Sequence, residues 1–501
     1  MSLFQPHFRR IYCIYQKKAV PLRRNKKYLN MLIGRTEESA RLRALLQSNK
    51  SEFIAIYGRR RVGKTYLVRE TFNYQFAFQH TGLYGASMSD QLREFQTSLR
   101  MYGHKPQAVP KSWYEAFAQL QELLATISTE KKVIFIDELP WMDTVKSGFI
   151  SALEHFWNAW ASARRDIILI VCGSATSWIM DKVILNHGGL HNRLTGRILL
   201  QPFTLRECEL FAQSQGVVLS RKDLIEAYMI MGGIPYYWTF LQRGMSLAQN
   251  IDQLFFQASG ELFLEFQALY ASLFKNATLH ISIVEALGKR KAGLLRQEIL
   301  DIAKLRDSGV FSKALNELEY CGFIRKYYAY DKKRKEATYQ LIDNYTLFYY
   351  QYIRANEHND EHFWSSSLQS SLHRTWAGIA FERVCLQHIT QIKRALGIEG
   401  VLTNVYSWQA KATDDYPGAQ IDLLLDRQDG IINICEAKFS STPYCMSQDD
   451  ENDLHRRQSV FVHRTKTTKA VHPILLTTYP PLENMHLRSI QKVITMEELF
   501  V

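Results

Sequence analysis

Short apolar segments alternate with amphipathic ones between residues 33 and 203. Four of the apolar segments have the length and composition of buried strands: 53–57, 133–136, 167–172 and 198–202. The stretches between them have the apolar spacing of amphipathic helices. Strands separated by helices are typical of a parallel sheet whose crossover helices cover its faces. The pattern therefore predicts an α/β core over residues 31–204.

Helical periodicity replaces the strand pattern after residue 204, and its one strong breaker is Gly232-Gly233-Ile234-Pro235. We expect a helical lid over residues 205–275. The next segment, 276–350, contains three helical stretches and then two strand-like ones (279–287, 295–304, 311–320; 323–330, 337–342). Three helices followed by a two-stranded ribbon predict a winged helix-turn-helix.

The charged stretch 355–363 is typical of a linker, which we place at residues 351–370. A last unit is expected over residues 371–501. Its elements alternate in the order helix, three strands, helix and strand (379–393; 401–406, 419–425, 431–437; 451–463; 472–477). This order predicts a second, separate α/β domain.

Length and composition agree with several packed domains. The 501 residues are 46% hydrophobic, and no apolar run approaches the roughly 20 residues of a membrane-spanning helix. The seven cysteines are scattered and form no C-x-x-C pair, which argues against zinc and disulfides and for a reducing compartment. We therefore expect a soluble, cytoplasmic protein.

The net charge of +13 favours a polyanionic partner. Part of it lies in a basic N-terminal arm, residues 1–30, which has no acidic residue and no apolar core of the kind a secretory signal needs. The arm has three open interpretations: a tail that touches nucleic acid, a transit peptide, or an upstream extension of a chain that starts at Met31.

One motif carries nucleotide chemistry. The run Gly58-Arg59-Arg60-Arg61-Val62-Gly63-Lys64-Thr65 fits G-x-x-x-x-G-K-[ST] and stands between an expected strand and an expected helix. Glycines let backbone N–H groups close around phosphate oxygens, and the helix N-terminus adds its positive dipole end. Lys64 would neutralise the β- and γ-phosphates of ATP, and the Thr65 hydroxyl would bind Mg²⁺.

A second strand supplies the matching carboxylates. Residues 131–138 are an apolar run that ends in Asp137 and Glu138. Asp137 would hold Mg²⁺, and Glu138 would polarise the attacking water as the catalytic residue. The next strand ends at Ser174, which places a small polar side chain where it would sense the γ-phosphate.

These motifs resemble the AAA+/STAND ATPases, and within them the so-called archaeal ATPases. Ile33-Gly34-Arg35 with Glu38 and Leu42 is similar to the family's "GR-x-x-E-x-x-x-L" segment. Gly233-Ile234-Pro235 resembles its "GxP" lid motif, which implies that Pro235 packs near the adenine. Residues 191–203 resemble its "R-x-x-G-R-i-x-L-x-P-f" segment. Arg193 and Arg197 of this segment are candidates for contacting the γ-phosphate or a neighbouring subunit's nucleotide, or else are surface charges.

The C-terminal unit carries a second candidate site. Asp422, with Glu436 and Lys438 on the next expected strand, resembles the D…E-x-K core of PD-(D/E)xK nuclease-like domains, which end many members of the family. Asp422 and Glu436 would converge as Mg²⁺ ligands, Lys438 would orient the attacking water, and Glu382 would be a further acid. Gln420 stands where relatives often have Glu, which makes the metal shell less anionic. The same fold also serves as an inactive binding module.

The winged helix has two open interpretations. Ser312, Lys313 and Asn316 on its second helix and a basic wing tip would contact DNA phosphates (Lys332, Lys333, Arg334 and Lys335). Alternatively, this unit packs against the ATPase and relays its nucleotide state.

Together these features predict an ATP-hydrolysing, Mg²⁺-dependent AAA+/STAND switch with a P-loop sheet, a helical lid, a winged helix and a restriction-endonuclease-like domain directed at DNA. The alternative is a non-catalytic, nucleotide-dependent regulator whose C-terminal domain binds nucleic acid or protein without cutting it. The expected partners are ATP and DNA but no membrane, with a homo-oligomer left open.

Overall fold

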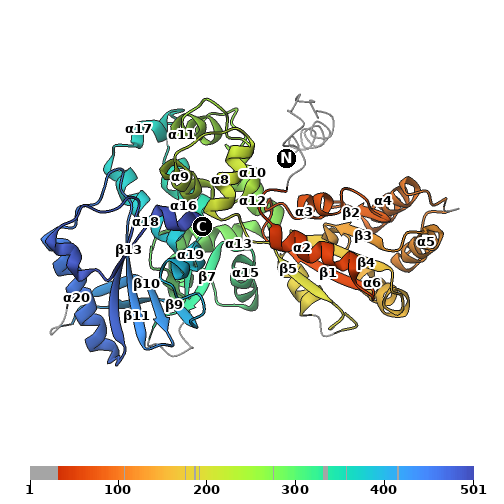
Figure 1. The fold of residues 1–501 in the computed structure, drawn as a ribbon. Coiled ribbons are helices and arrows are strands. Elements are labelled where there is room, and N and C mark those ends of the chain that lie inside the picture. Colours follow the sequence, from red (N-terminus) through yellow and green to blue (C-terminus); the bar gives the residue numbers. More distant parts are fainter. Residues whose placement is uncertain are drawn as a thin grey trace.

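The computed structural model of the chain describes residues 32–105, 108–174, 176–185, 188–190, 192–274, 276–330, 337–356, 358–413 and 417–501. The basic arm and the wing tip, Lys332 to Lys335, lie outside these residues. Figure 1 shows a first sheet at one end of the molecule, a second large sheet at the other, and mainly helical units between them. No helix of the described residues is long and apolar enough to cross a membrane.

The first sheet consists of five parallel strands in the order β2-β3-β4-β1-β5. Their bounds are Phe78–Thr81 for β2, Lys132–Asp137 for β3, Ile167–Gly173 for β4, Glu52–Tyr57 for β1 and Gly196–Leu199 for β5. The four expected strands are present, although β5 begins and ends earlier than expected. Strand β2 was not predicted because its sequence, FQHT, contains one apolar residue and forms no hydrophobic run.

Helices cover both faces of this sheet. The side chains of β1 alternate between the two faces, and those on each face pack against a different set of helices. Phe53 and Ala55 face a core that includes α4 (Met88–Met101), α5 (Trp113–Thr126) and α6 (Phe149–His155). Ile54 and Ile56 face α2 (Thr36–Ala44) and α3 (Lys64–Thr71). This second core continues into the helices that follow the sheet.

The helical lid consists of α8 (Leu205–Ser214), α9 (Arg221–Met231), α10 (Pro235–Trp238), α11 (Leu247–Ile251) and α12 (Glu265–Leu273). Helix α9 is enclosed, since every residue from Leu224 to Met231 is buried. It packs against α8 of the lid and against α16 (Asn344–Phe348) and α18 (Ser371–Gln387), so the lid is joined to later units of the chain.

A smaller unit, which we call the middle unit, follows the lid. It contains α13 (Ala277–Gly288), β6 (Leu294–Leu295), α14 (Arg296–Ala303), α15 (Gly309–Tyr320), β7 (Ile324–Tyr328) and β8 (Ala337–Leu341). Its three strands pair antiparallel in the order β6-β8-β7. Helix α15 packs against α7 (Thr176–Ile179), which directly follows the first sheet's central strand β4.

The segment expected as a linker is packed at both ends. Helix α16 (Asn344–Phe348) and a π-helical turn (Tyr349–Ile353) precede residue 355, and α17 (Phe363–Ser367) follows it. Trp364 is fully buried, with its ring 4.9 Å from that of Tyr352 and 5.3 Å from that of Trp376. The charged stretch that suggested a linker is largely exposed, but the aromatic residues on both sides fix it to the core.

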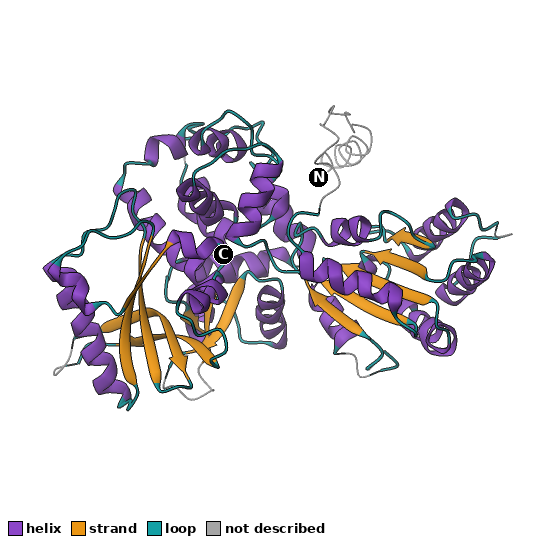
Figure 2. Ribbon diagram, in the orientation of Figure 1, coloured by secondary structure: helices purple, strands orange, loops and turns teal. Residues whose placement is uncertain are grey.

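The C-terminal sheet has the order β13-β12-β11-β10-β9. Strands β9 (Thr403–Ala410), β10 (Ala419–Arg427) and β11 (Ile431–Lys438) form an antiparallel meander, whereas β12 (Ala470–Thr477) and β13 (Lys492–Thr495) continue it in parallel. Helices α18 (Ser371–Gln387) and α20 (Gln448–Thr465) pack on opposite faces. Figure 2 shows that the strands of the protein fall into separate sheets joined by helices.

One apolar core joins these units. It includes Ile56 of β1, Ile225 of α9, Leu315 of α15, Phe381 of α18 and Leu476 of β12. A shared core of this kind resists independent movement of its parts, because close-packed interiors transmit displacement rather than absorb it.

Candidate functional site

The motif 58–65 forms a loop at the C-terminal end of β1. Gly58 and Gly63 have φ angles of 139° and 91°, which side chains disfavour. A Cβ on Gly58 would also lie 2.4 Å from the carbonyl oxygen of Leu200. Helix α3 starts at Lys64, so its first backbone N–H groups point into the loop. The result is the anion-binding geometry that the motif predicts.

The buried side chain of Lys64 is held inside this loop. Its Nζ donates hydrogen bonds to the carbonyl oxygens of Gly58, at 3.0 Å, and Arg59, at 2.9 Å. Burial lowers the pKa of Lys64 because its charged form is poorly solvated there, although nearby carboxylates oppose this shift. An anion in the loop would therefore meet a positioned ammonium.

Two oxygen groups that suit a divalent cation lie next to Lys64. The hydroxyl of Thr65 donates to Asp137 Oδ2 at 2.7 Å. The other oxygen of Asp137 accepts from the Cys172 thiol at 2.6 Å and from the Glu138 N–H at 2.9 Å. A hydroxyl beside a fixed carboxylate is a donor set that fits Mg²⁺ bound together with a nucleotide.

Glu138 is tethered to the end of the neighbouring strand. Its Oε2 accepts hydrogen bonds from the Ser174 N–H at 3.1 Å and from the Ser174 hydroxyl at 2.9 Å. Burial raises the pKa of Glu138, while the Lys64 charge acts in the opposite direction. A carboxylate with a raised pKa at a phosphate-binding loop has the character of a general base.

Residues from later units hold two arginines of the same loop. Arg59 forms an ion pair with Asp343, and its guanidinium lies 4.6 Å from the ring centre of Phe323. Arg61 pairs with Glu265 of α12 and lies 4.3 Å from the ring centre of Tyr236. The loop is therefore bound to the lid and to the middle unit through side chains that the sequence motif leaves variable.

The Gly-Ile-Pro segment of the lid lies beside this loop. Gly233 accepts a hydrogen bond from Phe203 N–H at 2.6 Å, and a Cβ on Gly233 would lie 1.9 Å from the Phe203 carbonyl oxygen. Pro235 begins α10, and the next residue, Tyr236, stacks on Arg61. The structure thus brings the residue after Pro235 into contact with the loop of residues 58–65.

Arg193 lies at the other end of the sheet. Strand β5 runs parallel to β1, with Gly196 beside Ile54 and Leu199 beside Tyr57. The loop follows the C-terminal end of β1, whereas Arg193 precedes the N-terminal end of β5. Because the two strands are parallel, the loop and Arg193 lie at opposite ends of the sheet. Arg193 and Arg197 are both exposed. The structure does not bring either arginine to the loop of the same chain.

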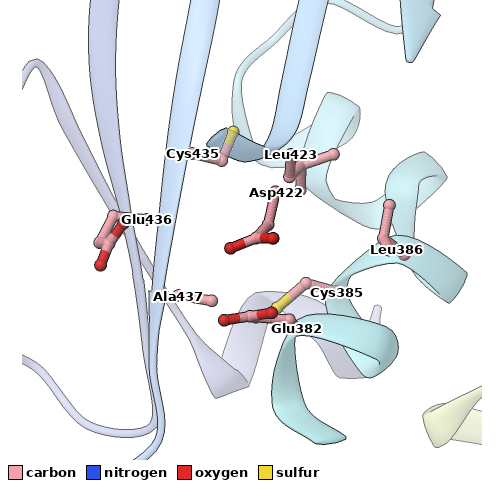
Figure 3. A pocket seen from close by; sticks show the side chains of 8 residues that line it. All are labelled: Glu382, Cys385, Leu386, Asp422, Leu423, Cys435, Glu436 and Ala437. Atoms are coloured by element: carbon pink, nitrogen blue, oxygen red, sulfur yellow. The ribbon is translucent and has the colours of Figure 1, made fainter. Parts of the chain in front are cut away.

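In the C-terminal unit, the structure brings Asp422 together with Glu382 of α18. Figure 3 shows both carboxylates in one pocket. Lys291, from the connection between α13 and β6, lies between them, with its Nζ 2.6 Å from Glu382 Oε1 and 3.1 Å from Asp422 Oδ2. An irregularity in β10 between Ile421 and Leu424 accompanies this placement, because it interrupts the alternation of side chains.

The carboxylate of Glu436 has other ion-pair partners than those of Glu382 and Asp422. Its carboxylate pairs with Arg457 of α20 at 2.7 Å and with Lys438 at 3.2 Å, and Lys438 also lies 3.6 Å from Asp450. In Figure 3 the Glu436 carboxylate lies apart from those of Asp422 and Glu382. Among the described residues, no group of three or more His, Cys, Asp or Glu side chains is arranged to hold a metal ion.

The partners of these sites were not foreseen from the sequence. Asp343 stands 284 residues after Arg59, and Lys291 stands 91 residues before Glu382. None of Asp343, Glu265 or Lys291 belongs to a recognisable motif. Such long-range pairs have no signal in the local pattern, because they depend on how the units pack.

Comparisons with known proteins identify the first part of the chain. Residues 32–240 match a family described as an ATPase domain predominantly from Archaea. The chain therefore contains an archaeal-type ATPase domain, which confirms this part of the sequence prediction. An uncharacterized protein of Methanocaldococcus jannaschii is 24% identical over 436 residues, which cover 86% of this chain and 92% of that protein.

Two solved structures illustrate the similarity to known folds. The Walker-type ATPase PABY2304 of Pyrococcus abyssi is 18% identical, with a TM-score of 0.46, over 63% of this chain and 95% of its own. The ORC2 protein of Aeropyrum pernix, in ADPNP–ADP complexes, is 13% identical, with a TM-score of 0.39, over 63% of this chain and 91% of its own.

Proposed function

We propose that this protein is an ATP-driven switch in which nucleotide binding at Lys64 and Thr65 controls a DNA-directed, nuclease-like C-terminal domain. The ATPase half of the proposal rests on the archaeal-type ATPase domain and on the geometry of its loop. The coupling half rests on one observation, the ion pair between Arg59 of the loop and Asp343 of the segment after β8.

The residues of the loop have separate parts in ATP hydrolysis. Lys64 and the N–H groups of α3 would bind the phosphates, and Thr65 with Asp137 would hold Mg²⁺. Mg²⁺ supplies charge neutralisation between the β- and γ-phosphates. Glu138 would orient the attacking water, and Ser174 fixes the Glu138 carboxylate for that purpose.

Arg59 is suited to report that phosphates have bound. Its Nε and Nη2 atoms are buried and have no hydrogen-bond partner among the described residues. A phosphate in the loop offers acceptors for these donors and competes with Asp343 for the guanidinium. Binding of ATP would then weaken the contact that holds the middle unit, which is the switching step.

The middle unit supports the winged-helix assignment by its order of elements, three helices followed by a ribbon. Its helix α15 packs on α7 with one side, while Lys313 and Asn316 are exposed on the other and Ser312 is bonded to Arg296. We infer that this unit chiefly relays nucleotide state, because its contacts to the loop are buried. The exposed side remains available to a DNA phosphate backbone.

The nuclease-like assignment of the last domain is supported by its helix–three strands–helix–strand order and by Asp422, Glu436 and Lys438 on adjacent strands. A second candidate function, nucleic-acid or protein binding without cleavage, is favoured by the ion pairs of these acids. Lys291 forms an ion pair with Asp422, and Arg457 forms one with Glu436. Catalysis with Mg²⁺ bound by Asp422 and Glu436 requires both pairs to open.

We also propose that Arg193 acts in trans. It is exposed on the turn before β5, on the side of the sheet away from its own nucleotide loop. From there it can reach only a nucleotide bound by another copy of the chain, which implies a homo-oligomer during hydrolysis.

The proposal is tested by incubating the purified protein with plasmid and oligonucleotides, with and without ATP and Mg²⁺. We expect DNA cleavage that needs both, and its loss in Lys64→Ala and in Asp422→Asn. Phosphate release from ATP should be lost only in Lys64→Ala. ATP-dependent DNA binding without any cleavage would establish the second candidate instead. Absence of ATP hydrolysis by the wild type would overturn both.

A further inference from the structure

The connection between α13 and β6 of the middle unit contacts the C-terminal domain through one side chain. Its Lys291 forms ion pairs with Glu382 and Asp422 at 2.6 and 3.1 Å. These two acids come from a helix and a strand of the last domain, whereas Lys291 stands 91 residues before Glu382. The ammonium thus bridges two carboxylates that are brought together by folding.

The position of Lys291 is fixed by its own backbone. Its carbonyl oxygen accepts hydrogen bonds from Gln340 Nε2 at 2.7 Å and from the buried Arg383. The next carbonyl, that of Ala292, accepts from the Tyr327 hydroxyl. Gly293 has a φ of 85°, and a Cβ there would lie 2.5 Å from the Tyr339 carbonyl oxygen. A surface lysine in chance contact with two acids would not need such a support.

The charges around the two acids oppose any additional cation. Arg383 is 1% exposed, and Arg325 is half-buried near both Arg383 and Asp422. With Lys291 and with Arg457, which pairs with Glu436, four basic side chains lie around the three carboxylates that line this pocket. Glu382 Oε2 is buried and has no hydrogen-bond partner among the described residues, so an acceptor site on this carboxylate is unused. An oxygen ligand is therefore present, but the local charge excludes a divalent cation while Lys291 stays.

We propose that Lys291 is a tethered cation that competes with a divalent metal ion for Glu382 and Asp422, so that the last domain takes up metal only when Lys291 withdraws. This rests on the proposed nuclease-like function, to which it adds the means of control. A metal ion needs the carboxylate oxygens at about 2.0–2.6 Å, where it cannot share them with an ammonium. Because Lys291 occupies the carboxylates, the apparent metal affinity equals the intrinsic affinity multiplied by the fraction of molecules in which the site is free.

The release of Lys291 is linked to the nucleotide loop through one strand. Gln340 of β8 holds the Lys291 carbonyl, and Asp343, three residues later, holds Arg59. A shift of β8 that follows the loss of the Arg59 contact would move the support of Lys291 as well. Both contacts are made by the middle unit, so they respond to the same displacement.

The test is a Mn²⁺ titration of the full-length protein without nucleotide, followed by electron paramagnetic resonance of free Mn²⁺. We expect Lys291→Gln to bind Mn²⁺ about tenfold or more tightly than the wild type, because the competing charge is removed. The gain should vanish when Asp422→Asn is added. Lys291→Arg, which keeps the charge, should bind as weakly as the wild type.

The matched control is Lys289→Gln, which removes the same charge from an exposed position of the same connection. It should leave Mn²⁺ affinity unchanged, and circular dichroism should show the same folded content for each variant. Equal Mn²⁺ affinity in Lys291→Gln and Lys289→Gln would overturn the inference, even if ATP-dependent cleavage is observed. Tighter Mn²⁺ binding by Lys291→Gln without DNA cleavage would support the inference and count against the nuclease function alone.

Discussion

Arg59 and Asp343 form a buried ion pair across 284 residues of sequence. Their exposed fractions are 7% and 4%. Burial by itself lowers the pKa of Arg59, but the charge and hydrogen bond of Asp343, together with Tyr237 and Tyr270, outweigh it, and the net shift of the pKa is upward. Asp343 also accepts hydrogen bonds from the N–H and hydroxyl of Thr346 at the start of α16. One carboxylate therefore connects the nucleotide loop with the beginning of the segment that leads to the last domain.

The strength of this connection can be measured with a double-mutant cycle. Asp343→Asn leaves Arg59 buried without its counter-charge, and we expect a loss of about 3–5 kcal/mol in stability. Adding Arg59→Met should recover part of this loss, since both charges are then absent. Urea unfolding of the wild type, the single variants and the double variant gives the coupling energy.

Arg60→Met is the matched control for that cycle. Arg60 is the next residue of the loop, and no ion pair of its side chain occurs within the described part of the chain. Its substitution should change stability by less than about 1 kcal/mol and show no coupling to Asp343→Asn. Additive effects of Arg59→Met and Asp343→Asn would contradict the proposed connection.

Two substitutions separate nucleotide binding from hydrolysis. Lys64→Ala should abolish ATP binding, because the loop loses the ammonium that faces the β- and γ-phosphates. Glu138→Gln should bind ATP normally but hydrolyse it at least about a hundredfold more slowly, because only activation of water is lost. Calorimetric titration with ATP and a phosphate-release assay measure the two quantities. Unchanged ATP affinity in Lys64→Ala would refute the assignment of the loop.

Much of the ATPase domain could be predicted because its signals are local. The P-loop has a fixed spacing, and strands β1, β3 and β4 are buried apolar runs whose length identifies them. Strand β2 gave no such signal, since it includes polar residues such as Gln79 and His80. The buried His80 is accommodated by a hydrogen bond between its Nδ1 and the Ser98 hydroxyl at 2.9 Å, a contact that the strand's own sequence does not reveal.

The carboxylate site shows the limit of sequence reasoning. Alternation along β10 and β11 predicted that Asp422 and Glu436 converge, and both residues line one pocket. Their ion-pair partners differ, since Asp422 pairs with Lys291 and Glu436 with Arg457. Glu382 was expected at the site and does meet Asp422. The lysine that joins them comes from another unit, and its approach depends on packing between units that no local pattern encodes.

The acidity of Glu382 makes a prediction about pH. Burial and repulsion by Asp422 raise the pKa of Glu382 to about 7, although Lys291 opposes the shift. The folded protein then binds this proton more tightly than the unfolded chain, so stability falls as pH rises from about 4.5 to about 7. Relative to Glu382→Gln, the free energy of unfolding of the wild type should fall by up to about 3 kcal/mol as the pH rises across this window.

Urea unfolding at several pH values measures this difference. Glu361→Gln, which makes the same change at an exposed position, is measured as the control at each pH. If the difference in free energy of unfolding between the wild type and Glu382→Gln stayed constant from pH 4.5 to pH 8, the environment assigned to Glu382 would be wrong.

Amide hydrogen exchange of residues 289–295 measures directly whether ATP bound at the loop changes the environment of Lys291. With a non-hydrolysable ATP analogue, we expect exchange in this segment to become faster than with ADP, because the support from Gln340 and Arg383 is released. Lys64→Ala should show no such change. If the analogue protects residues 58–65 from exchange while residues 289–295 exchange as they do with ADP, the two sites are not coupled.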